Sequence, residues 1–262
     1  MDLAAGLDLS LTALALLALA GFASGWIDAV VGGGGLLQLP ALLLVPGMTP
    51  LNALATNKVG SIMGTSVSSL TYYRRIQPDL RTGLPMAGVA LLTAILGARL
   101  ASLIPAHALR ILILLVLIGV AIYTIAKPHL GVVTNLRWQG RTHLLAALLL
   151  GAVLGLYDGL LGPGTGTFLV LGLVGMVGYA FLPATAIAKI VNFATNLGAL
   201  IFFIPSGAVV WSAGIVLGIA NMCGGYTGAR MAIAKGATFI RVVFLVVVFA
   251  LILRISWDIA FT

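Results

Sequence analysis

Apolar stretches alternate with short polar breaks along the whole chain, and their order repeats once. In the first half the apolar stretches cover residues 9–31, 36–44, 52–73, 83–103 and 107–126. In the second half they cover residues 142–161, 165–179, 184–204, 209–232 and 238–255. The second stretch of each half is shorter than the ~20 residues that a straight helix needs to cross a bilayer. The pattern predicts an all-α integral membrane protein in which each half holds a broken or re-entrant helix pair plus three transmembrane helices.

The two halves align in register around a lysine. Residues 58–73 and 189–204 are apolar stretches that each open on a lysine and carry polar positions at helical spacing. One gap earlier, the same alignment matches Asp28 with Asp158. A helix pair contributes an even number of crossings, and three further helices make the number odd. The halves are therefore expected to form two inverted-topology repeats, an arrangement found in many secondary transporters.

Basic residues in the loops predict the orientation of these repeats. We divide the chain into a first membrane repeat at 1–126, a cytoplasmic linker at 127–141 and a second membrane repeat at 142–262. Arg74, Arg75 and Arg81 follow the third apolar stretch of the first half, whereas the matching loop of the second half is uncharged. Placing these arginines, the linker and the turn at 230–241 in the cytoplasm collects most basic residues on one side. Both termini then lie outside.

Composition supports the membrane assignment and removes one class of partner. Hydrophobic residues make up 61% of the chain, charged residues 8%, and the mean hydropathy is +1.18. Such a chain has too little polar surface for water, so we expect the lipid bilayer of the cell (cytoplasmic) membrane as its environment. The net charge of +8 comes from basic residues scattered among loops rather than gathered in one stripe, so no nucleic-acid partner is expected. Homo-oligomerisation stays open.

Four ionisable residues lie inside the apolar stretches: Asp28, Lys58, Asp158 and Lys189. Each costs roughly 2.5–3.5 kcal/mol near the middle of a membrane helix, so together they cost about 10 kcal/mol. They are expected to line a wet cavity or to pair. Two simpler readings stay open: the lysines could snorkel to an interface, and the acids could cap helices or pair with lysines instead of carrying protons.

Each lysine begins a polar stripe with spacing i, i+3 and i+7, which places the side chains on one helix face. The stripes consist of Lys58, Ser61, Thr65 and Ser68 in the first half and of Lys189, Asn192 and Asn196 in the second. Hydrogen-bond donors next to an ammonium group favour an oxyanion, and Asn57 is a further candidate donor. The alternative is that the hydroxyls and amides only join helices, at about 0.6 kcal/mol each.

Glycine clusters precede the short second stretch of each half, at 32–35 (GGGG) and 162–166 (GPGTG). Glycine lets the backbone leave helical geometry and turn N–H groups into a cavity, and the next helix begins there with its positive dipole end. Such breaks are tolerated at membrane depth only where protein or water satisfies the backbone. The backbone of Gly33, Gly34, Gly164 and Thr165 is therefore a candidate part of the site. Close helix packing is the alternative role.

A family resemblance rests on these same residues. The run GWIDAVVGGGGLLQLPALLLVPGMTPLNALATNKVGSIMGTSVSSLTYYRR resembles the start of the sulfite exporter TauE/SafE (TSUP) family, and AIAKIVNFATNLGALIFF with GGYTGARMA resembles its second half. The resemblance covers essentially the whole chain. It implies a permease of the cytoplasmic membrane for sulfite, sulfonates such as sulfoacetate, and related anions. The residues alone lead only to a small oxyanion.

Other function classes fit the sequence less well. It contains no HExxH or GxSxG motif and no paired catalytic carboxylates, so we expect neither an enzyme nor a catalytic residue, and neither a metal nor a cofactor. A cation permease would need more acids in the bundle. A passive anion channel and a permease for a non-sulfur organic anion remain alternatives.

We expect a secondary transporter that exports a small sulfur-containing anion by alternating access. Lys58 and Lys189 would neutralise the anion. Asn57, Thr65, Asn192, Asn196 and the glycine-cluster backbone would orient it. Asp28 and Asp158 are the candidates for coupling a proton.

Overall fold

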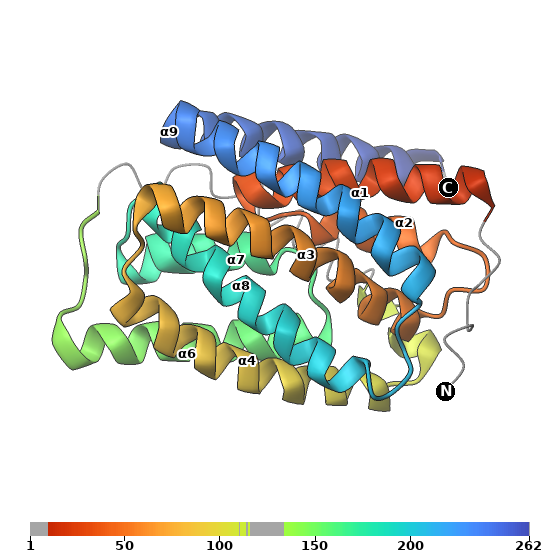
Figure 1. Cartoon of the computed structure of the whole chain (residues 1–262), viewed down its shortest axis with the longest axis horizontal. Helices are drawn as coiled ribbons and strands as arrows, with labels where there is room; N and C mark the ends of the chain where they lie inside the picture. Colours follow the sequence, from red (N-terminus) through yellow and green to blue (C-terminus); the bar gives the residue numbers. More distant parts are fainter. Residues whose placement is uncertain (1–9, 110, 114, 116–133, 262) are drawn as a thin grey trace.

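The ordered elements of the chain are helices. The computed structural model describes residues 10–109, 111–113, 115 and 134–261, and no strand occurs within these ranges. The helices are α1 (Leu11–Val31), α2 (Gly35–Leu43), α3 (Pro50–Ile76), α4 (Leu80–Leu103), α6 (Gly140–Leu160), α7 (Thr165–Gly172), the π-helix η1 (Leu173–Val177), α8 (Phe181–Phe203) and α9 (Trp211–Phe261) (Figure 1). The predicted all-α class is confirmed.

Within the described part of the chain, four helices are long and apolar enough to cross a membrane: α1, α4, α6 and α8. The 27 residues of α3 extend about 40 Å, but this helix carries the predicted polar stripe. In α9 the backbone leaves helical geometry at Gly236 (φ 73°, ψ −167°), so α9 consists of two arms, as the separate stretches 209–232 and 238–255 predicted. Most of the predicted stretch 107–126 and the first seven residues of the linker, 127–133, lie outside the described residues.

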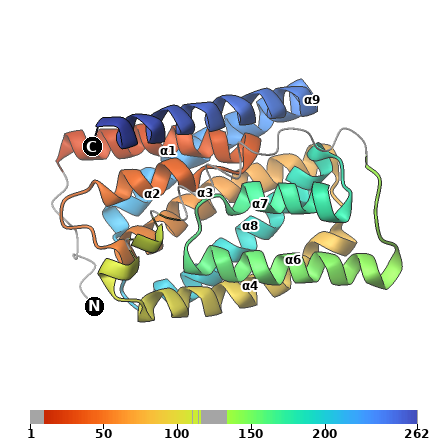
Figure 2. The same ribbon diagram turned by 180° about the vertical axis from the view of Figure 1, so that it is seen from behind.

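The short elements turn back instead of crossing the bundle. With nine residues, α2 is only about 13 Å long, and it runs beside α1 towards the end where α1 begins (Figure 2). The eight residues of α7 relate to α6 in the same way, and η1 extends α7. Each pair therefore forms a hairpin whose second arm runs back along the first.

The tips of the two hairpins touch each other. The carbonyl oxygen of Gly32 accepts a hydrogen bond from the amide of Thr167 at 3.1 Å, and the hydroxyl of Thr167 donates to the carbonyl oxygen of Val31 at 3.0 Å. Gly32 has φ of 82°, and a Cβ there would lie 2.5 Å from the amide nitrogen of Thr167. Only glycine combines this backbone angle with this approach.

In each half, two helices pack on a helix of the other half. Helix α1 packs on α9 and α3 on α9, while α6 packs on α4 and α8 on α4. Pairs of small residues at i and i+4 make two of these contacts: Gly21 and Gly25 face α9, and Gly155 and Gly159 face α4. Corresponding helices run in opposite directions across Figure 1: α1 against α6, α3 against α8, and α4 against the first arm of α9.

Basic residues gather at one end of the bundle. Arg74 and Arg75 lie in the last turn of α3, Arg81 near the start of α4, Arg141 near the start of α6, and Lys235 at the end of the first arm of α9. These helix ends meet at the left of Figure 1, whereas α1 begins and α9 ends at the right.

A polar cluster ties the halves together at the basic end. Asp79, the N-cap of α4, accepts hydrogen bonds from the hydroxyls of Tyr179 (2.8 Å) and Thr82 (2.7 Å), and Nε2 of His143 lies 3.0 Å from Thr82 Oγ1. Partial burial opposes ionisation of Asp79, but these hydrogen bonds and the amide of Arg81 outweigh it and lower its pKa. Burial raises the pKa of Tyr179 to about 12.

Candidate functional site

Two buried ion pairs cross between the halves at the centre of the bundle. Nζ of Lys58 in α3 lies 2.8 Å from Oδ2 of Asp158 in α6, and Nζ of Lys189 in α8 lies 2.8 Å from Oδ2 of Asp28 in α1. Both lysine side chains are only 1% exposed. The lysines therefore do not snorkel, and each acid pairs with the lysine of the other half.

Local sequence sets the position of these four residues along their helices. Each lysine follows the first residue of its helix by about 12 Å. Each acid lies in the last turn of the helix that leads into a glycine break. The breaks end α1 and α6 there, so the carboxylates lie beside the hairpin tips.

The two pairs are not equivalent in their hydrogen bonding. Lys189 Nζ donates to Oδ2 of Asp28 and also to the backbone carbonyl oxygen of Asp28. The contact between Lys58 and Asp158 is equally short but lacks hydrogen-bond geometry, and Oδ2 of Asp158 has no hydrogen-bond partner among the described residues. Oδ2 of Asp158 can therefore still accept a hydrogen bond, whereas Oδ2 of Asp28 already accepts one from Lys189.

A small polar cavity adjoins the unsatisfied pair. Its volume is about 10 Å³, and its lining residues are Asp28, Gly32, Gly35, Asn57, Lys58, Ser61, Asp158, Gly162, Gly164, Thr165, Gly166, Asn192 and Asn196. A cavity of this size holds at most about one water molecule. The structure is therefore a closed conformation, and a ligand of several heavy atoms requires the helices around the cavity to separate.

Eight of the candidate residues from the sequence line this cavity: Asp28, Asn57, Lys58, Asp158, Gly164, Thr165, Asn192 and Asn196. Four others do not: Lys189, Thr65, Gly33 and Gly34. Lys189 is held by Asp28, and the hydroxyl of Thr65 donates to the carbonyl oxygen of Ser61 at 2.8 Å. Gly34 packs against Asp28 and Ser24, and its carbonyl oxygen accepts a hydrogen bond from Ser24 Oγ at 2.8 Å.

Some residues of the cavity wall were not predicted from the sequence. Gly32, Gly162 and Gly166 belong to the two glycine clusters, but no sequence feature distinguishes them from the neighbouring glycines. Gly162 matters because a Cβ there would lie 2.9 Å from Nζ of Lys58. The absent side chain thus lets the ammonium group reach the tip of the second hairpin.

A buried amide beside the cavity wall was also missed. Oε1 of Gln38 in α2 accepts hydrogen bonds from Ser24 (3.3 Å), Ser61 (3.2 Å) and Asn221 (3.4 Å). Nε2 of Gln38 has no partner among the described residues. A glutamine inside a nine-residue apolar helix was the signal for this hub, which links α1, α2, α3 and α9 behind Ser61.

Comparison with known proteins identifies the family of this chain. The model of the family described as sulfite exporter TauE/SafE matches residues 17–255. The chain belongs to the TauE/SafE family. It is 39% identical over 251 residues to "Probable membrane transporter protein ORF9" of Sinorhizobium sp, covering 96% of this chain and 95% of that protein.

Further TauE/SafE-like relatives are similar over most of their length. "Probable membrane transporter protein" of Haemophilus influenzae is 33% identical over 252 residues, covering 96% of this chain and 98% of that protein. YfcA of Escherichia coli K12, also named "Probable membrane transporter protein", is 33% identical over 235 residues, covering 90% and 86%. No solved structure matches the chain significantly. The chain is thus a multi-pass membrane protein of a transporter family.

The charges at the centre of this TauE/SafE protein balance. Two lysines face two aspartates, so the closed site is neutral when all four are ionised. An anion that enters a dry neutral site adds an uncompensated negative charge unless an acid takes up a proton or a cation accompanies it. Among the described residues no group of three His, Cys, Asp or Glu side chains could hold a metal ion.

Proposed function

We propose that this protein is a secondary transporter, and not an enzyme, for a small sulfur-containing anion such as sulfite or an organosulfonate like sulfoacetate. One observation carries the proposal: the buried ammonium of Lys58 faces a closed polar cavity, and Oδ2 of its partner Asp158 has no hydrogen-bond partner among the described residues. A sulfite or sulfonate group offers three oxygen acceptors, which suits an ammonium with three donors surrounded by amide groups. The family description favours the sulfur anion and its export.

In this proposal the anion competes with Asp158 for Lys58. The amides of Asn57, Asn192 and Asn196, with the backbone at Gly164 and Thr165, orient the bound oxyanion. When Lys58 turns to the anion, Asp158 loses its only countercharge in a site that is almost dry. Its carboxylate then takes up a proton, because an unpaired buried charge is more costly than a neutral acid. The anion and one proton consequently move together, with Asp158 as the proton carrier.

The second pair has a different role in this mechanism. Lys189 holds both the carboxylate and the backbone carbonyl oxygen of Asp28, directly before the break at Gly32. This pair fastens the tip of the first hairpin to α8. We assign it to holding the tip rather than to binding the anion.

Alternating access is supported by the arrangement of the two halves. The opposite directions of corresponding helices and the packing of each half on a helix of the other suit two inverted repeats, at 1–126 and 142–262, joined by the linker 127–141. Rocking of one half against the other would open the cavity first to one side and then to the other. The basic end of the bundle is assigned to the cytoplasm, which puts both termini outside.

A thermal-shift screen tests the substrate class. Purified protein is heated with sulfite, sulfate, thiosulfate, sulfoacetate, taurine or carboxylate analogues, and a ligand at 100-fold its Kd adds about 2.7 kcal/mol of stability. Sulfite or sulfoacetate should stabilise the wild type and the control Arg99→Gln, whose exposed arginine does not line the cavity. Stabilisation only by carboxylates would overturn the sulfur assignment, and no stabilisation by any anion would overturn the binding site.

Proteoliposomes separate the carrier from the passive anion channel. A carrier shows faster uptake of labelled anion when unlabelled anion is present inside, whereas a channel gives a steady anion current under voltage clamp. If Asp158 carries the proton, Asp158→Asn should keep anion exchange but lose uptake driven by a pH gradient. Full pH-driven uptake in that variant would remove Asp158 from coupling.

A further inference from the structure

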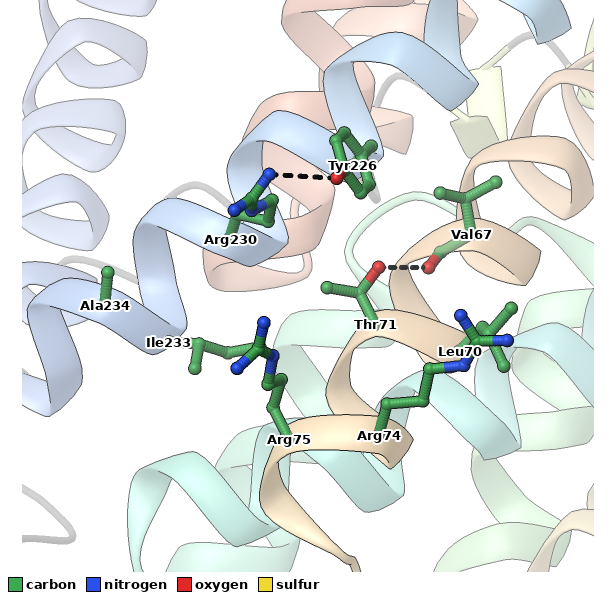
Figure 3. Close-up of a pocket in the computed structure, with 9 residues that line it drawn as sticks. All are labelled: Val67, Leu70, Thr71, Arg74, Arg75, Tyr226, Arg230, Ile233 and Ala234. Atoms are coloured by element: carbon green, nitrogen blue, oxygen red, sulfur yellow. Dashed lines mark hydrogen bonds between the residues drawn. The ribbon is translucent and has the colours of Figure 1, made fainter.

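An open groove lies away from the central cavity, at the basic end of the bundle (Figure 3). It has a volume of about 540 Å³ and lies between the last turns of α3 and the first arm of α9 just before Gly236. Its main lining residues are Arg74, Arg75 and Arg230 with Tyr226, Leu70 and Ile233, and we call it the arginine groove. Since α3 belongs to the first half and α9 to the second, an occupant would touch both repeats.

The arginine groove carries positive charge without a protein counterion. The only ion pairs among the described residues are the two at the centre of the bundle, so none of the three arginines has a described carboxylate partner. Nη1 of Arg230 donates to the hydroxyl of Tyr226 at 3.0 Å, and its guanidinium lies 5.5 Å from the centre of that ring. These contacts hold Arg230 in place and leave most of its five donors free. Guanidinium groups bind phosphate oxygens in pairs.

Polar and apolar residues are layered along the arginine groove. Arg74 and Arg75 lie in the last turn of α3, while Val67 and Leu70 lie up to about 10 Å deeper along the same helix. Leu70 is 48% exposed, and Ile233 continues the apolar wall from α9. The hydroxyl of Thr71 is bonded to the carbonyl oxygen of Val67 at 2.7 Å, so it is not free for a ligand. On α3 the charge lies at the mouth with apolar surface beneath it, which matches the order of a phospholipid, whereas on α9 Arg230 lies about 5 Å deeper than Ile233.

The arginine groove is separate from the anion cavity. No lining residue is common to both, and Arg74 lies about 24 Å along α3 from Lys58. A soluble anion would gain nothing from the apolar wall. Basic pockets between membrane helices on the cytoplasmic side bind anionic headgroups in general.

We propose that the arginine groove binds an anionic phospholipid, with the headgroup phosphate at Arg74, Arg75 and Arg230 and an acyl chain against Val67 and Leu70. The bound lipid bridges α3 and α9 and so stabilises the contact between the halves. This site does not depend on the identity of the transported anion.

The test compares lipids and matched variants of the full chain. Protein in a neutral detergent is titrated with phosphatidylglycerol, phosphatidylcholine or soluble glycerol phosphate, and binding is followed by the shift in melting temperature. The groove variant is Arg74→Gln/Arg75→Gln/Arg230→Gln. The control loses three exposed arginines outside the groove: Arg81→Gln/Arg99→Gln/Arg141→Gln.

Phosphatidylglycerol should bind the wild type and the control tightly, and binding should weaken about fivefold for each groove arginine removed. Equal loss in the control would show a general charge effect and overturn the site. An equal response to glycerol phosphate would make it a soluble-anion site, which also contradicts the proposal.

A second measurement uses only the wild-type protein, so it does not depend on the folding of variants. Phosphatidylglycerol with a photoreactive acyl chain should label peptides from 67–75 and 226–234. Labelling confined to other helices would overturn the proposal.

Discussion

The ion pair of Lys58 and Asp158 makes a quantitative prediction about stability. Their side chains are 1% and 3% exposed, so neither charge can be left alone without loss. Removing one partner of a buried pair costs roughly 3–5 kcal/mol, because the other charge stays buried without compensation. Lys58→Gln and Asp158→Asn should each lower the free energy of unfolding by about that amount. The double variant should recover most of it.

The assay is unfolding in mixed micelles, followed by tryptophan fluorescence, for the wild type, both single variants and the double variant. Arg99→Gln removes an exposed charge and should stay within about 0.5 kcal/mol of the wild type. A coupling energy below about 1 kcal/mol would refute the buried ion pair.

Three further predictions follow from the fold. Single cysteines at the exposed positions Gln77 and Ser206, in a background without other cysteines, should react with impermeant reagent from opposite sides of the membrane; labelling from one side would contradict inverted repeats. Gly32→Ala should lower the free energy of unfolding by several kcal/mol, because Gly32 has a positive φ and contacts the second hairpin. The control Gly88→Ala should be neutral or slightly stabilising, because a Cβ there meets nothing within 4 Å. Equal melting temperatures of the two variants would contradict the tip contact. The lowered pKa of Asp79 adds stability above pH ~4 that is lost as the pH falls further, so Asp79→Asn should be destabilising at pH 7 and nearly neutral at pH 3; a difference that persists at pH 3 would exclude this cause.

Periodicity and glycine placement predicted most of the fold. Apolar stretch lengths gave the helices, and the short second stretches with glycine clusters in front marked the hairpins. Both signals are local: hydrophobic length sets a membrane helix, and a glycine run lets one end. The direction in which α2 and α7 turn back depends on contacts between the tips, such as that between Gly32 and Thr167. Those contacts join residues far apart in the sequence, so no local pattern encodes them.

The site could be predicted in its residue types but not in its pairing. The free-energy cost of placing a charge inside a membrane helix was enough to mark the two lysines and two acids, because such groups are rare there. Internal symmetry suggested equal roles for the two halves. In the structure Lys189 donates two hydrogen bonds to Asp28, while Lys58 and Asp158 face the cavity. That difference lies in side-chain contacts between the two halves, which a repeat pattern does not contain.

Anion exchange by the neutral double variant tests the central claim most directly. Lys58→Gln/Asp158→Asn keeps the shape of the pair without its charges, so the protein should fold and reconstitute like the wild type. In proteoliposomes preloaded with unlabelled sulfite, the wild type and Arg99→Gln should take up labelled sulfite at equal rates, and the double variant should fall to the rate of empty liposomes. Wild-type exchange by a folded double variant would show that the anion does not bind at Lys58.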